Sequence, residues 1–207
     1  MEMLKFEKKL YKEGYALIGG IDEVGRGPLV GPVVSACVIL PKNFYHKDIK
    51  DSKKISEKKR EELYDIIIEN AIDVGIGIID SKRIDEINIY EATKEAMQMA
   101  VDNLKIKPEY LLIDAMKLNI DIPYEAIIKG DAKSESIAAA SIIAKVTRDR
   151  MLIELDKKYP MYNFKKNKGY GTKEHIDAIN KYGVLDSHRR SFKPVSDALL
   201  KEKVVQK

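Results

Sequence analysis

The stretch GGIDEVGRGPLVGP, residues 19–32, decides how the start of this chain folds. An apolar run that begins at Ala16 closes in two adjacent acids, Asp22 and Glu23. A glycine-rich turn follows, and then a second apolar run, VVSACVIL, at residues 33–40. Short apolar runs bounded by turn residues are typical of buried strands. The stretch therefore predicts two joined strands, with unexplained negative charge where the first one closes.

The glycines of this stretch do not form a dinucleotide-binding motif. That motif has the spacing G-x-G-x-x-G and opens a helix. Here the glycines are Gly25, Gly27 and Gly31, so the second interval is one residue longer than in the motif. Pro28 and Pro32 then lead into a strand rather than a helix. What remains is a bare backbone turn, whose N–H and C=O groups can approach a ligand closely because glycine has no side chain.

The rest of the chain alternates between strand and helix patterns. This alternation predicts one α/β domain with an early antiparallel portion. We expect Ser56 and Thr172 to cap two of the helices, and we expect two helices, a short one and a longer one, between residues 81 and 104. The expected strands are 16–22, 31–40, 73–80, 110–115 and 125–131, and the other expected helices are 56–71, 134–159, 172–183 and 194–205.

Composition places few limits on function. The chain has 207 residues and a net charge of +4, and its lysines and arginines gather in three clusters, any one of which alone is typical of a solvated surface. The single cysteine, Cys37, cannot form an internal disulfide, and its apolar surroundings predict a buried thiol. No apolar run is long enough to span a bilayer. We expect a cytoplasmic protein without a membrane segment.

Acidic residues close three of the expected strands. Asp22 and Glu23 close the first, and Asp114 and Asp131 close two later ones. If these strand ends lie side by side, the carboxylates converge, and their mutual repulsion favours a bound hard cation such as Mg²⁺. For both Asp22 and Glu23 to reach a metal, the strand must end or twist there. The alternative is a set of solvated turn residues or helix caps, which competes most strongly for Asp131.

Six motifs, in this order along most of the chain, together resemble the ribonuclease HII (type II ribonuclease H) family. The family usually has Asp-Glu-Ala-Gly-Arg-Gly, so Val24 replaces the commoner alanine. Type III relatives usually carry another residue in place of Arg26 and an extra N-terminal domain, so Arg26 and the short N-terminus favour type II. The motifs are GIDEVGRGPLVGPVV at 20–34, DSKK at 51–54, LLIDA at 111–115, KGDAKSESIAAASIIAKVTRDR at 129–150, KGYGT at 168–172 and HRRSFKPV at 188–195.

The resemblance implies a ribonuclease H-like fold and a metal-dependent endonuclease. The implied architecture is a single α/β domain over residues 1–207, with a mixed five-stranded sheet flanked by helices and a small helical, substrate-contacting region at about 160–207. The implied activity is cleavage of RNA in RNA–DNA hybrids and on the 5′ side of ribonucleotides embedded in duplex DNA. Two Mg²⁺ or Mn²⁺ ions would act with substrate bound, leaving 5′-phosphate and 3′-hydroxyl ends. The implied catalytic metal ligands are Asp22, Glu23, Asp114 and Asp131, the last binding least directly.

The resemblance also implies residues that contact the substrate. The ribose 2′-hydroxyl, the group that distinguishes RNA from DNA, would be recognised by the backbone of Gly25-Arg26-Gly27 together with Tyr170. A packed core position for Tyr170 fits its polar neighbours less well. Other side chains would contact phosphates, although each lysine could equally be a solvated surface residue. These phosphate contacts are Arg26, Lys53, Lys133 and Ser134.

Two other functions remain open at this point. A non-catalytic nucleic-acid-binding module could keep the fold but would be expected to lose a carboxylate. Another nuclease of the same fold, such as a junction resolvase or transposase, would cut DNA that contains no ribonucleotide. We expect a monomer whose partners are hybrids and ribonucleotide-containing DNA, and no catalytic role for His46, His175 or His188.

Overall fold

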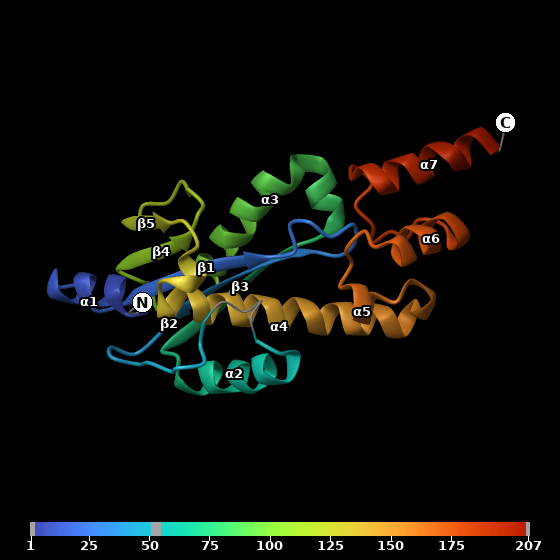
Figure 1. Cartoon of the computed structure of the whole chain (residues 1–207). Coiled ribbons are helices and arrows are strands. Elements are labelled where there is room, and N and C mark those ends of the chain that lie inside the picture. Colours follow the sequence, from blue (N-terminus) through green and yellow to red (C-terminus); the bar gives the residue numbers. More distant parts are fainter. Residues whose placement is uncertain (1–2, 51–54, 206–207) are drawn as a thin grey trace.

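A computed structural model of the chain describes residues 3–50 and 55–205 (Figure 1). Its centre is a five-stranded mixed sheet with the strand order β3-β2-β1-β4-β5. Strands β1, β2 and β3 pair antiparallel, whereas β4 pairs parallel to β1 and β5 parallel to β4. The strands are β1 Ile18–Val24, β2 Val33–Ile39, β3 Asp73–Ile79, β4 Tyr110–Asp114 and β5 Tyr124–Ile127.

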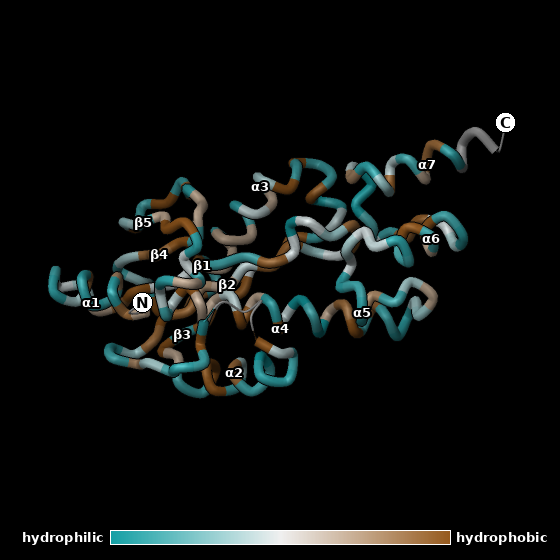
Figure 2. The backbone as a smooth tube through the Cα atoms, in the orientation of Figure 1, coloured by the Kyte–Doolittle hydropathy of each residue, from teal (hydrophilic) through white to brown (hydrophobic). Residues whose placement is uncertain are grey.

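Helices cover both faces of the sheet (Figure 1). Helices α2 (Glu57–Asn70) and α4 (Glu135–Lys158) lie on one face, and α3 (Ser81–Asp102) lies on the other. Side chains of a strand alternate between faces, so Val34, Ala36 and Val38 pack towards α4 while Cys37 packs towards α3. Figure 2 shows hydrophobic and hydrophilic residues alternating along α2, as expected for a helix with one buried side.

The remaining helices lie at the two ends of the molecule (Figure 1). Leu10 of helix α1 (Lys5–Lys12) packs in one apolar cluster with buried residues of the sheet. The C-terminal region is helical, as expected, and follows the far end of α4. It contains α5 (Phe164–Asn167), α6 (Lys173–Tyr182) and α7 (Lys193–Val205). Among the described residues, no helix has both the length and the apolar character needed to cross a bilayer.

Helix α4 approaches the sheet unusually closely because small residues line the contact. A Cβ atom at Gly20 would lie 2.1 Å from the backbone carbonyl carbon of Ser136, so only glycine fits on β1 at this point. Four alanines follow this contact along α4, and all of them are buried. They are Ala138, Ala139, Ala140 and Ala144. The close packing brings the next polar residues of α4 over the end of β1.

Most of the expected elements are confirmed, with three corrections. Ser56 and Thr172 accept hydrogen bonds as N-caps, and Asn88, with φ 71°, separates the two parts of α3. Strand β1 does not end at the acids but continues to Val24. The fifth strand stops at Ile127. Asp131, which was expected to close it, therefore lies beyond it, in a 3₁₀ turn, η2, at Gly130–Ala132. Helices α1 and α5 were not predicted from the sequence.

Candidate metal centre and substrate cleft

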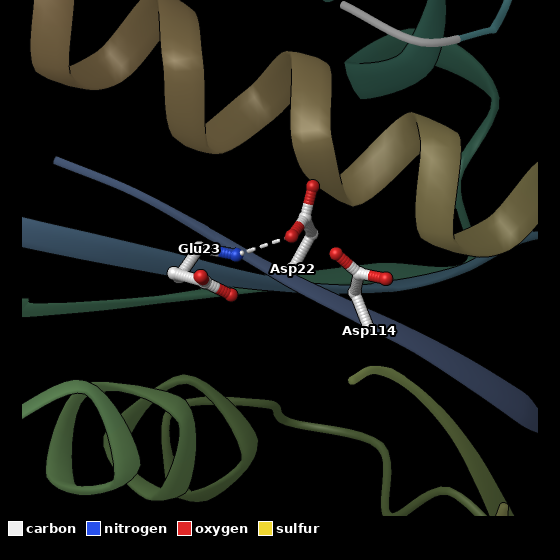
Figure 3. Close-up of side chains that lie close together, drawn as sticks. All are labelled: Asp22, Glu23 and Asp114. Carbon is white, nitrogen blue, oxygen red and sulfur yellow. Dashed lines mark hydrogen bonds between the residues drawn. The ribbon is translucent and has the colours of Figure 1, made fainter. Parts of the chain in front are cut away.

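Three carboxylates meet at the end of strands β1 and β4 (Figure 3). One oxygen atom from each of Asp22, Glu23 and Asp114 lies within 4.8 Å of the other two. The sheet register explains two of them, because Ile21 pairs with Ile113 and both pack on the α3 side. The residues that follow, Asp22 and Asp114, therefore both point towards α4. The predicted convergence of these acids is confirmed for this group of three.

Glu23 reaches the cluster although it follows Asp22 on the same strand. Its backbone N–H donates to Asp22 Oδ1 at 2.8 Å, which holds the two residues together. Its Oε1 lies 3.6 Å from Nη1 of Arg26 in the following turn. The strand keeps pairing as far as Val24 opposite Val34, so the longer glutamate side chain, rather than an early strand end, carries this carboxylate to the group.

Burial and neighbouring negative charge disfavour the charged forms of Asp22 and Glu23. Burial raises the pKa of Asp22 well above its ordinary value, the negative charges of Glu23 and Asp114 raise it further, and a hydrogen bond from the Ser141 hydroxyl opposes the rise. Burial also raises the pKa of Glu23, while the charge of Arg26 lowers it. Buried like charges of this kind require either a proton or a cation.

The donor set fits a divalent cation. Carboxylate oxygens are the ligands that Mg²⁺ and Mn²⁺ prefer, and three converge here. Glu23 Oε2 is buried and accepts no hydrogen bond from the described residues. A bound cation would satisfy this oxygen and offset the repulsion that raises the pKa of Asp22.

Asp131 lies at the same pocket but not within the group of three. Its 3₁₀ turn is held to the site because the Gly130 N–H donates to Asp114 Oδ1 at 2.6 Å. The pocket encloses about 360 Å³. It is lined by Asp22, Glu23, Val24, Arg60, Asp114, Asp131, Ser141, Lys145 and Tyr170.

Three of the polar lining residues were not identified from the sequence as site residues: Arg60, Ser141 and Lys145. Ser141 and Lys145 stand four residues apart on α4, which places them on one helix face. Lys145 Nζ donates to Asp149 Oδ1 at 2.7 Å, and burial lowers the pKa of Lys145. The i, i+4 spacing of Ser141 and Lys145 could have indicated from the sequence that they face the same site. Arg60 lies on a different helix, and no local pattern links it to the site.

The glycine-rich turn and Tyr170 lie against each other at one side of the pocket. A Cβ atom on Gly27 would lie 3.4 Å from Cε1 of the Tyr170 ring, so the ring packs on the bare backbone. Tyr170 is 48% exposed, which makes it a surface residue rather than a core tyrosine. Gly25, with φ +94°, takes a backbone conformation that favours glycine.

The predicted phosphate contacts occupy different kinds of position. Lys53 lies outside the described residues, as does the rest of the DSKK motif. Arg26 is exposed and Lys133 donates from Nζ to the carbonyl of Ile128 at 2.7 Å. Ser134 is buried; its hydroxyl caps α4 and donates to Glu7 Oε1 at 2.6 Å, so it has a structural position beneath the surface.

Two histidines form a buried pair away from the carboxylates. His175 Nε2 and His188 Nε2 lie 3.0 Å apart, and His175 Nδ1 lies 2.9 Å from the carbonyl oxygen of Tyr170. Both side chains are buried, consistent with structural roles. Cys37 is buried as predicted, and burial raises the pKa of its thiol.

Comparisons with known proteins agree with this geometry. Residues 19–195 match the family model described as Ribonuclease HII. The chain is 61% identical over 201 residues to ribonuclease HII of Bacillus mycoides, covering 97% of this chain and 78% of that one. It is 60% identical over 198 residues to ribonuclease HII of Enterococcus faecalis, covering 96% and 78%. A crystal structure of ribonuclease H2 from Pyrococcus horikoshii superposes with a TM-score of 0.79 and 28% identity, covering 90% of this chain and 99% of that one.

Proposed function

The chain belongs to the ribonuclease HII family and is an endoribonuclease that acts on RNA–DNA hybrids, and from this premise we propose two finer properties. The first is that it also cuts duplex DNA on the 5′ side of single embedded ribonucleotides. The second is that it works with two Mg²⁺ or Mn²⁺ ions held by its carboxylates. The observation that carries both is one pocket that joins Asp22, Glu23 and Asp114 to Tyr170.

The carboxylates supply the metal site in this proposal. Asp22, Glu23 and Asp114 would hold the ions, and Asp131 would take part from the adjoining turn. When bound, divalent ions would activate a water and stabilise charge on the attacking and leaving oxygens. The water would attack phosphorus and the bond from phosphorus to the 3′ oxygen would break, which leaves 5′-phosphate and 3′-hydroxyl ends. The Ser141 hydroxyl keeps Asp22 in its orientation through their hydrogen bond. No side-chain nucleophile is needed.

Recognition of a single ribonucleotide requires contact with its 2′-hydroxyl. We assign this contact to the backbone of the Gly25-Arg26-Gly27 turn and to Tyr170. The exposed ring of Tyr170 lies beside Gly27 and lines the pocket that holds the carboxylates, so a sugar seated there would contact both the ring and the turn. A site built to bond a hydroxyl rejects the analogue that lacks it, because its own polar groups are then left unpaired.

The duplex itself is held through its phosphates. Arg26 and Lys133 are the described basic side chains that we assign to this role, and Lys53 is assigned from the family motif alone. The buried Ser134 positions α4 instead. The C-terminal helical region, about residues 160–207, contributes Tyr170 and the exposed lysines around it. Phosphate contacts of this kind weaken with salt.

The carboxylate cluster and Tyr170 lie on the same chain, so the proposed site needs no residue from a second subunit, and we propose that the enzyme acts as a monomer. The one cysteine is a buried free thiol, in keeping with a reducing compartment. We therefore place the activity in the cytoplasm, on ribonucleotides left in DNA by replication and removed by excision repair.

The test uses three duplexes that differ only in sugar chemistry: a full RNA–DNA hybrid, a DNA duplex with one ribonucleotide, and the all-DNA duplex. Each is incubated with the protein and Mg²⁺, Mn²⁺ or EDTA, and the ends are mapped. We expect cuts in the first two duplexes, 5′ to the ribonucleotide, and none in EDTA. Equal cutting of the all-DNA duplex would indicate a DNA nuclease instead. Cleavage that survives EDTA would exclude the metal mechanism.

A further inference from the structure

A buried arginine holds the glycine-rich turn from beneath. Arg189 is fully buried, and its guanidinium bonds only to backbone carbonyl oxygens among the described residues. Nη2 donates to Gly25 O at 2.5 Å, Nη1 to Arg26 O at 2.9 Å, and Nε to Gly31 O at 3.0 Å. One side chain therefore gathers three carbonyls of a turn that lies more than 150 positions earlier in the sequence.

The orientation of these carbonyls fixes the opposite side of the turn. A trans peptide unit is planar, and its N–H points away from its C=O. The described peptide bonds are all trans. Because the carbonyls of Gly25 and Arg26 point inwards to Arg189, the next two N–H groups, those of Arg26 and Gly27, point outwards. Neither of these N–H groups donates to another described residue.

The outward N–H groups lie beside the proposed ribose site. The Tyr170 ring packs on Gly27, and Tyr170 lines the pocket with the carboxylates. We propose that Arg189 is a positioning residue for 2′-hydroxyl recognition: by binding the carbonyls of Gly25 and Arg26, it presents two successive N–H donors to the 2′ oxygen of the ribonucleotide. This inference rests on the proposed cleavage of single ribonucleotides.

Arginine is specifically suited to this task. Its planar fork supplies donors in fixed directions, whereas lysine has a single ammonium that cannot reach three carbonyls in the same geometry. Burial, together with the nearby positive charge of Arg148, lowers the pKa of Arg189 to about 9. A buried cation without a carboxylate partner is costly. The three carbonyls, and the ring of Phe192 at 5.0 Å, offset this cost.

Arg148 provides a control because it is a second buried arginine beside the same turn. It packs against Gly25, where a Cβ would lie 2.3 Å from its Nε, but it bonds to different carbonyls. It is also buried, and it also donates only to carbonyls, those of Pro32, Lys168 and Val30. It does not bond to the carbonyls of Gly25 or Arg26. Replacing either arginine by lysine therefore removes a buried guanidinium fork, but only Arg189→Lys releases the two peptide units that present the N–H donors.

The experiment compares the wild type, Arg189→Lys and Arg148→Lys. Fluorescence anisotropy with Ca²⁺ in place of Mg²⁺ gives the dissociation constants for a one-ribonucleotide duplex and for the all-DNA duplex. Single-turnover cleavage with Mg²⁺ at saturating enzyme gives the chemical rate. Thermal unfolding checks that the two variants lose similar stability.

For Arg189→Lys we expect the binding preference for the ribonucleotide duplex to fall roughly tenfold, towards no preference, with all-DNA binding little changed. The saturating cleavage rate should fall as well. Arg148→Lys should keep most of the wild-type preference. An equal preference in the two variants would overturn the inference. Failure of the wild type to cut the ribonucleotide duplex would instead count against the proposed function.

A second measurement covers the case in which Arg189→Lys does not fold. In ¹⁵N-labelled wild type with Ca²⁺, the amide signals of Arg26 and Gly27 should shift when the ribonucleotide duplex is added, and shift less with the all-DNA duplex. Identical shifts with both duplexes would show that these N–H groups do not bind the 2′ oxygen, and Arg189 would then have no positioning role.

Discussion

Asp22 and Asp114 lie on adjacent parallel strands, each directly after one member of the Ile21–Ile113 register pair. With one oxygen of Glu23, their carboxylate oxygens fall within 4.8 Å of one another. Parallel pairing alone thus brings together two acids that are remote in the sequence, and burial under α4 raises the pKa of Asp22. The negative charges repel one another until a bound cation or a proton neutralises part of the charge.

Asp22→Asn should abolish cleavage while leaving the fold intact. We expect the rate to fall by roughly three orders of magnitude, because a ligand of the metal site is lost. The same change removes one of three repelling charges, so the metal-free protein should become more stable. The melting temperature should rise by about 2–4 °C for each kcal/mol of repulsion relieved. Calorimetry in EDTA measures this rise, and a large drop in melting temperature would contradict it.

Mn²⁺ should stabilise the wild type in a pH-dependent way. A ligand at about 100 times its dissociation constant stabilises the folded state by about 2.7 kcal/mol. The raised pKa of Asp22 and Glu23 means that protons compete for the site at a pH above the ordinary carboxyl range. The increase in melting temperature produced by Mn²⁺ should therefore shrink as the pH falls. Asp22→Asn is the control, and it should show little increase at any pH.

Tyr170→Ala should weaken the preference for ribonucleotides. The exposed ring packs on Gly27 and forms one wall of the proposed sugar site. Loss of a hydrogen-bond partner at a buried polar group costs about 1–3 kcal/mol, so the preference should fall at least roughly fivefold. Tyr182→Ala is a matched control, because Tyr182 is 49% exposed against 48% for Tyr170 and does not line the pocket. Equal losses in both variants would argue against a specific role.

His188→Gln should reduce the loss of folding stability that accompanies a fall in pH. Burial, together with the charge of the neighbouring His175, lowers the pKa of His188 from 6.5 to about 4. Between these two values the unfolded chain binds a proton that the folded chain does not. Wild-type stability should therefore fall as the pH drops from about 6.5 to about 4, by on the order of 2–3 kcal/mol. Urea unfolding across this range should show a smaller fall in the variant.

Local patterns in the sequence were sufficient for most elements. The apolar runs before Asp22 and Asp114 predicted β1 and β4, and Ser56 and Thr172 marked helix starts, because capping and periodicity depend on nearby residues. The position of Asp131 was harder to predict, since Ile128 continues the apolar pattern of β5 beyond the last paired residue, Ile127. Where a strand stops is set by its partner, which a local pattern does not contain.

The sequence by itself determined that acids follow three apolar strand patterns, which turn is bare backbone, and which family the chain resembles. Only the tertiary structure decided that Glu23 joins Asp22 and Asp114, that Ser134 is buried, and that Arg189 holds the turn. The reason is physical. Each of these facts depends on strand register or on side chains meeting across long stretches of chain, and such contacts arise from packing between elements rather than from the preferences of any one segment.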